Sequence, residues 1–239
     1  MLKVLSVFLS FVVSIGFALG ATLPPPLEAA VRDAETRKTA AVENDLEFTF
    51  SVHTVTSEDE FRLRYDPSRP KTWTLESEET KDSAKLMERM EQRAEDRTDD
   101  DEAPDRRLII GDLRELFGDR IELAETGAAG RVYRFSLSDK AQIGGGGGGQ
   151  NFDVSKYLTG ELAIDADNRL RWLRFFAEEA FKPVFVAKIN SFDLKMFIDP
   201  IWPDGPYVIV RQVMDMDGSA FFKSFSENVK TVYTDFEKR

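Results

Sequence analysis

The stretch from Tyr157 to Val213 constrains the fold most, because it contains several consecutive runs in which apolar side chains alternate with others. Leu158, Leu162 and Ile164 fall on one face of the first run, and a second run follows at 170–176 after the turn-like residues 165–168. The two runs predict a β-hairpin. One face of these runs is apolar and the other partly so, and we therefore expect a sheet that needs cover on both sides.

The rest of this stretch predicts further strands. Pro183 opens a long run through Ile198 that places Phe185 on the same side as Ala187 and Ile189. Residues 199–206 contain three prolines and a glycine, which predict a loop before a strand at 207–213. Residues 213–218 contain two aspartates and a glycine and predict a turn, after which a closing strand runs through 229–233.

In the first half of the chain, the spacing of apolar residues predicts both helices and half-buried strands. Apolar residues at spacings of three and four predict an amphipathic helix over 27–42, a second helix from Asp82 and a short one over 111–118. Alternation predicts strands at 46–52, 61–65, 73–75, 121–123 and 132–137. We expect residues 21–239 to form one β-rich domain.

The N-terminal residues predict the compartment. Lys3, an apolar run through Leu19 and small residues at 18–21 are typical of a cleaved secretory signal peptide over residues 1–20. A membrane anchor is the competing interpretation, but the run is shorter than a spanning helix. The sequence contains no cysteine, so we expect neither disulfides nor a lipid-modified cysteine. These features favour a soluble protein of the periplasm of a Gram-negative bacterium.

Charge restricts the partners. The net charge of −11 disfavours nucleic acid and anionic lipid head groups. We expect no nucleic-acid partner and no transmembrane segment after signal cleavage. Contact with a membrane would require apolar side chains or a local basic patch.

Two polar segments are predicted to be mobile insertions, namely residues 97–105 and 141–150. The acidic cluster at 99–102 lacks the spaced oxygens and turn glycine of a calcium loop, and we predict no metal site there. The six glycines at 144–149 lack the following Lys-Ser or Lys-Thr and helix of a phosphate loop, so we interpret them as a tether.

Catalytic signals are weak. His53 is the sole histidine, and its place on the polar side of a strand predicts a surface residue. Carboxylates are plentiful, but none forms a pair in an apolar setting that would separate acid and base roles. We predict no catalytic residues, no cofactor and no enzyme activity.

Aromatic residues on strands are the candidate site. The side chains that alternation places on apolar faces, and that we predict to line a ligand cavity, are Phe48, Phe50, Phe61, Trp73, Tyr133 and Phe135. The alternative is that they form an ordinary filled core under the helices.

The chain resembles the periplasmic lipoprotein carriers of the LolA and LolB type, as a distant relative of unknown ligand. The resemblance rests on residues 64–75, with a Tyr-Asp-Pro segment leading to Trp73-Thr-Leu75, and on residues 160–165 and 229–236. It implies an α+β fold, with a single curved antiparallel sheet, or unclosed barrel, and two or three helices on its concave face. It also implies that acyl chains bind there and that an early-strand arginine, Arg62 or Arg64, controls a lid.

The expected function is therefore binding of an acyl chain or lipid-modified partner in an apolar cavity. An envelope sensor or scaffold that contacts another protein without catalysis is the alternative, and an enzyme ranks third. The partner is a lipid, an acyl chain or an envelope protein.

Overall fold

The computed structural model describes residues 22–69, 71–77, 84, 87, 88, 104–139, 155–221 and 223–239. Most of them belong to one eleven-stranded sheet in the order β3-β2-β1-β11-β10-β9-β7-β6-β5-β4, with β8 paired to β9. The strands are β1 (Phe48–Thr56), β2 (Glu60–Tyr65), β3 (Trp73–Leu75), β4 (Phe117–Gly127), β5 (Gly130–Leu137), β6 (Thr159–Ile164), β7 (Leu170–Phe176), β8 (Phe181–Val184), β9 (Ala187–Pro200), β10 (Tyr207–Ala220) and β11 (Lys223–Lys238). The described helical elements are α1 (Pro25–Glu43), α3 (Pro104–Leu108) and the single 3-10 turns η1 (Leu113–Leu116) and η2 (Ser155–Tyr157).

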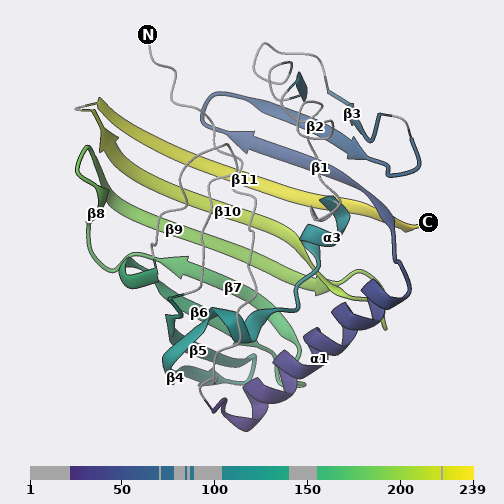
Figure 1. Cartoon of the computed structure of the whole chain (residues 1–239), viewed down its shortest axis with the longest axis horizontal. Helices are drawn as coiled ribbons and strands as arrows, with labels where there is room; N and C mark the ends of the chain where they lie inside the picture. Colours follow the sequence, from purple (N-terminus) through teal and green to yellow (C-terminus); the bar gives the residue numbers. More distant parts are fainter. Residues whose placement is uncertain are drawn as a thin grey trace.

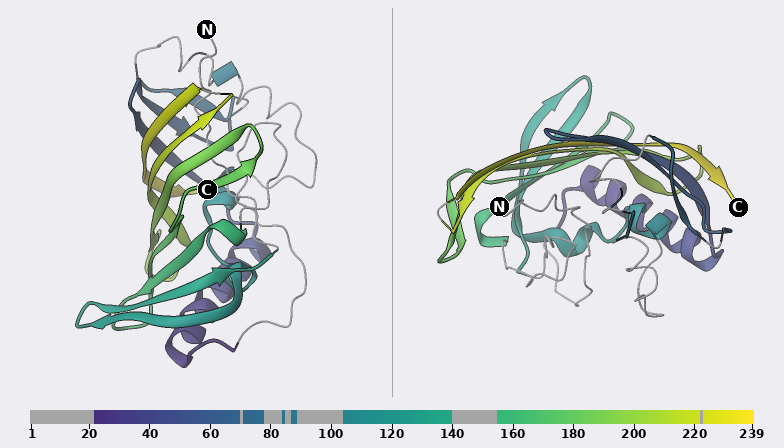
Figure 2. Two further views of the ribbon diagram at one scale, coloured as in Figure 1. Left: turned by 90° about the vertical axis from the view of Figure 1, so that its left-hand side faces the viewer. Right: turned by 90° about the horizontal axis from the view of Figure 1, so that it is seen from above.

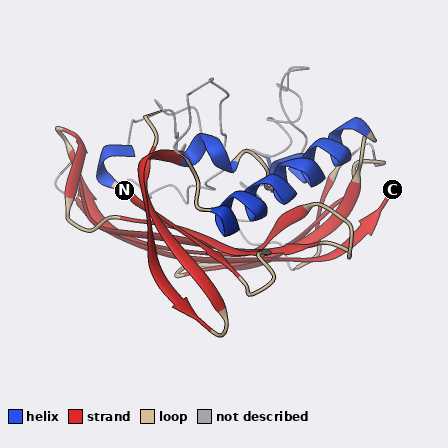
Figure 3. Ribbon diagram, turned by 90° about the horizontal axis from the view of Figure 1, so that it is seen from below, coloured by secondary structure: helices blue, strands red, loops and turns tan. Residues whose placement is uncertain are grey.

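The sheet is antiparallel and does not close, which confirms the sequence prediction of one large unclosed sheet. It curves into an arch, with α1 and α3 on its concave side (Figures 2 and 3). The hairpin of β4 and β5 leaves the arch and extends on the convex side (Figure 2). The concave side is therefore the inner face of the molecule.

Helix α1 forms where the sequence places one apolar stripe after three prolines. Pro25 occupies the first turn, where a backbone N–H would have no partner within the helix. The carboxylate of Glu28 in the same turn is stabilised by the positive end of the helix dipole. The buried stripe consists of Leu27, Ala30, Val31, Ala34 and Ala41. Its small alanines let the helix lie close to β7 and β10 at one end of the arch (Figure 1).

One predicted turn is wrong. Residues 213–218 lie within β10, which continues to Ala220. Met214 and Met216 pair with Leu194 and Phe192 of β9, whereas the alternating aspartates point to the solvent-facing side. The two aspartates therefore belong to the alternating pattern of a strand and not to a turn. Gly218 lies at a register shift against β9, where a Cβ atom added to it would lie 2.6 Å from the carbonyl oxygen of Lys188.

The predicted continuous run from Pro183 is also wrong. It divides into β8 and β9, with a tight turn at residues 185–186 that lets Val184 pair with Ala187. Phe185 is 99% exposed at this turn and belongs to no apolar strand face. The predicted helix over 111–118 shortens to η1 for a similar reason, since Phe117 already enters β4.

Several predictions fall outside the described residues. These are the signal peptide at 1–20, the tether at 141–150, and the insertion at 97–105 apart from its last two residues, which begin α3. Of the predicted helix from Asp82, only residues 84, 87 and 88 are described, and they are helical. Strands β5 and β6, which flank the tether, pair directly with each other.

Candidate functional site

The concave face is built by strict alternation along the strands. On β1 and β2 the buried residues Val52, Phe61 and Leu63 alternate with polar ones such as the half-buried His53 and the exposed Arg62. Successive side chains of a strand point to opposite faces, so one face of the arch is mainly apolar.

The structure places all six predicted site residues in the hydrophobic cluster of this face. Phe48, Phe50, Phe61, Tyr133 and Phe135 are buried in it, and the half-buried Trp73 packs against it.

These residues do not form one site, because they lie in two groups near opposite edges of the sheet. In the first group, on β1 to β3, the rings of Phe50 and Trp73 have centroids 5.7 Å apart and meet edge to face. The second group is on β5, where the ring of Phe135 lies 4.7 Å from that of Phe117. Five strands, β11, β10, β9, β7 and β6, separate the groups.

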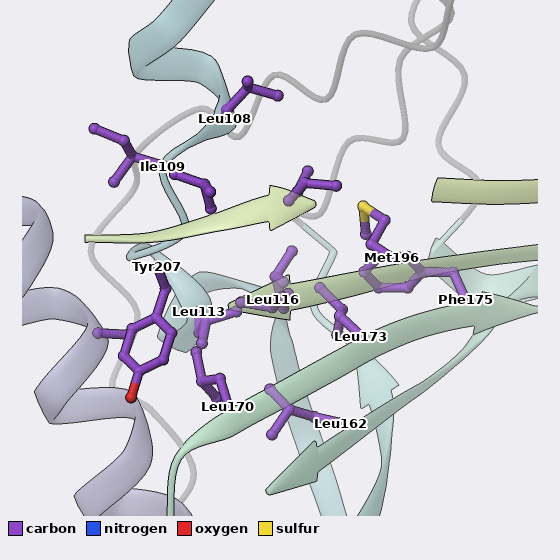
Figure 4. Close-up of a cluster of buried hydrophobic side chains, with 14 of the residues drawn as sticks. Leu108, Ile109, Leu113, Leu116, Leu162, Leu170, Leu173, Phe175, Met196 and Tyr207 are labelled. Carbon is purple, nitrogen blue, oxygen red and sulfur yellow. The ribbon is translucent and has the colours of Figure 1, made fainter. Parts of the chain in front are cut away.

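The sequence reasoning left out the residues that connect the two groups. Tyr65 joins the first, with its ring 5.0 Å from Trp73. The middle of the face is lined by Leu162, Leu173, Phe175, Leu194, Met196 and Met214. Figure 4 shows part of this lining beneath η1, whose Leu113 and Leu116 lie over it. The alternation in residues 157–213 was the signal that could have identified them.

A polar row interrupts the apolar lining on β1, β10 and β11. The buried hydroxyls of Thr54 and Thr231 lie 3.2 Å apart across the two strands, and Gln212 pairs with Thr231 on the other side. Farther along β11, the Glu227 Oε2 atom is buried and accepts no hydrogen bond from the described residues. Burial, and then the charge of Glu58, raises the pKa of this carboxyl.

A hollow lies between α1 and η1, and most of the residues that line it are charged. Its volume is about 430 Å³, and it is lined by Glu35, Lys38, Thr39, Val42, Glu43, Asp112, Arg114 and Glu115. Arg114 donates to Glu28 Oε2 at 2.9 Å and to Glu35 Oε2 at 3.1 Å, and Lys38 pairs with Asp112. These charges fasten α1 to η1, and the lining is unsuited to an acyl chain.

The predicted lid arginines lie on the wrong face. Arg62 and Arg64 alternate with the buried Phe61, Leu63 and Tyr65, so they point away from the helices. Arg64 donates to the Thr49 hydroxyl at 2.7 Å and pairs with Glu237 at 3.2 Å. Neither arginine can act on a cover of the concave face.

The described residues offer no metal centre, since no three potential ligands among them converge. The Nε2 atom of His53 lies 2.8 Å from Glu60 Oε1 at the surface of the convex face. Within the described ranges, no helix has the length and apolar character needed to span a membrane. The chain matches no family model, no curated protein and no solved structure.

Proposed function

We propose that this protein binds an acyl chain, or the acyl group of a lipid-modified protein, against the concave face of its sheet in the periplasm. The observation that carries the proposal is an unclosed sheet with a large apolar face, broken by one polar row, over which the described helix α1 lies at one end (Figure 1). The resemblance to lipoprotein carriers supplies the ligand class.

The chemistry of the face suits this ligand. Each methylene group that leaves water contributes about 0.8 kcal/mol, so a long acyl chain gains most from a long apolar surface rather than a short pocket. Aromatic and methionine side chains fit such a flexible chain closely.

Tryptophan emission can test the proposal, because the three tryptophans occupy different environments. Trp73 on β3 and Trp202 in the loop after β9 both pack against the hydrophobic cluster, whereas Trp172 lies on the convex face beneath Lys195. In a Trp172→Phe, Trp202→Phe background, Trp73 alone reports. Titration with a fatty acid or a lipid analogue should then give a saturable blue shift.

A matched pair of variants locates the binding. Phe61→Ala, on the concave face, should weaken the shift, whereas Phe197→Ala, on the convex face, should leave it unchanged. Mass spectrometry of the purified protein should also find a co-purified acyl compound. Absence of both the saturable shift and any bound acyl compound would refute the proposal.

A second function, as a scaffold for another envelope protein, is favoured by a patch on the convex face. Lys195 Nζ lies 3.9 Å from the ring centroid of Trp172, and the Arg211 guanidinium lies 3.7 Å from that of Phe197. Neither cation forms an ion pair within the described part of the chain. Half-buried cations on aromatic rings suit an acidic protein segment, and charge reversal at Lys195 would abolish capture of such a partner.

A further inference from the structure

Two neighbouring hairpin turns carry apolar side chains that are exposed to solvent. Phe185 is 99% exposed and Val186 is 44% exposed in the β8–β9 turn, and Phe221 is 66% exposed in the β10–β11 turn. The turns lie side by side at the left of Figure 1. A hydrogen bond joins them, in which the backbone N–H of Phe221 donates to the carbonyl oxygen of Val186 at 3.0 Å. We call Phe185, Val186 and Phe221 the apolar tip.

Phe221 is placed there at a cost to the fold. Its φ of 48° lies in the left-handed region, where glycine and asparagine are favoured and a bulky side chain is strained. A tight hairpin turn normally carries glycine or asparagine at a position with positive φ. Since Phe221 is mostly exposed, its ring returns little packing energy for this strain. A residue that breaks the local rule without benefit to the core indicates a role outside folding.

The tip is surrounded by positive charge in an acidic protein. Lys182, Lys188 and Lys223 flank the two turns and are exposed, and none of them forms an ion pair in the described structure. The segments 182–188 and 219–223 contain no aspartate or glutamate, although the whole chain carries a net charge of −11. The apolar tip therefore has a basic rim.

We propose that the apolar tip inserts into the surface of a bilayer that contains anionic lipid, with the three lysines on the lipid head groups. The tip consists of two protruding turns, and a bilayer interface accepts protruding apolar side chains without a preformed pocket. Basic side chains beside them gain from the negative surface potential. This docking does not depend on acyl binding by the concave face.

Vesicle flotation tests the proposal with protein expressed from the full-length sequence, whose N-terminus is determined by intact mass. The protein should float with vesicles of phosphatidylethanolamine and phosphatidylglycerol, and less with phosphatidylcholine alone. The double variant Phe185→Ser, Phe221→Asn should lose roughly tenfold or more in partitioning. Replacing the three lysines by glutamine should remove the preference for anionic lipid and its salt sensitivity.

The chain offers a matched control. Leu123 is 52% exposed on the β4–β5 hairpin, away from the apolar tip (Figure 1), so Leu123→Ser should not change flotation. Because the sequence has no cysteine, Val186→Cys and Leu123→Cys each accept a single environment-sensitive label. The label at 186 should shift to the blue on vesicles, and the label at 123 should not.

Other outcomes overturn the proposal. No flotation of the wild-type protein, or flotation unchanged in the double variant, would exclude docking through the apolar tip. A double variant that loses self-association in sedimentation, with unchanged vesicle binding, would assign the tip to a protein contact. Since asparagine tolerates the φ of residue 221, a cooperative melting curve with a midpoint no lower than that of the wild type separates loss of binding from loss of folding.

Discussion

Gly160 is the position at which a single methyl group should disturb the concave face most clearly. It lies on β6 opposite Phe135 of β5 and Phe175 of β7. An added Cβ would lie 2.3 Å from the Cε2 and Cζ atoms of Phe135. That is more than an ångström inside the ordinary distance between carbon atoms.

The ring of Phe135 has little room to move. It is buried and meets the ring of Phe117 edge to face at 4.7 Å. Overpacking of this kind costs about 1–3 kcal/mol. Replacing glycine by alanine also reduces the conformational freedom of the unfolded chain, which stabilises the folded protein by about 0.4–1 kcal/mol. We therefore expect Gly160→Ala to lower the free energy of unfolding by about 1–2 kcal/mol.

Urea denaturation at neutral pH measures this loss, and a thermal scan should show a fall of about 2–8 °C. Gly127→Ala is the control, because an added Cβ there meets nothing within 4 Å. It should be neutral or slightly stabilising. In a Phe135→Leu background the cost of Gly160→Ala should shrink, since the two positions share one contact. A Gly160→Ala protein as stable as the wild type would refute the overpacking argument.

Three further predictions concern the ends and the polar groups of the sheet. Tyr207 donates to Asp33 Oδ2 at 3.0 Å, and burial raises its pKa to about 12. Because the neutral phenol is favoured in the fold, the advantage of the wild type over Tyr207→Phe in denaturation should be complete below pH 10 and disappear between pH 10 and about 12. Since burial raises the pKa of Glu227, its carboxylate opposes folding above its ordinary pKa of 4.5, and Glu227→Gln should stabilise the protein at pH 8. The gain should stay below about 1 kcal/mol, because the half-buried group is screened by solvent, and should vanish in denaturation curves below pH 4.5, where both side chains are neutral. Phe221→Asn should raise the melting temperature by relieving about 1 kcal/mol of left-handed strain, and an unchanged or lower value would contradict the strain argument.

The sequence predicted strands well where two-residue alternation was undisturbed. Phe61 to Tyr65 and Trp73 to Leu75 are strands within a residue of the predicted bounds. It placed the turn at 165–168 correctly but failed at two others, because the rules expect glycine, asparagine or aspartate in a turn. The turn at 185–186 contains none of these, whereas residues 213–218 contain two aspartates and a glycine inside a strand.

The candidate site was predictable only in part. Alternation correctly assigned residues such as Phe48 and Phe135 to an apolar face, but it could not show that they lie near opposite edges. Strand order depends on pairing between residues far apart in the chain, which local patterns do not encode. The same limit hid the apolar tip, since the turn that holds Phe221 and the turn that holds Phe185 meet only in the folded sheet.

The place of β11 in the sheet sets the order in which the protein can form. Strand β11 pairs with β1 on one side and β10 on the other, so the strands made first join the rest of the sheet only through the strand made last. Contacts of such long sequence separation make folding slow. A nascent chain therefore cannot complete its arch while residues 223–238 remain unsynthesised. That delay keeps the polypeptide unfolded for longer, which suits a protein predicted to cross a membrane before it folds.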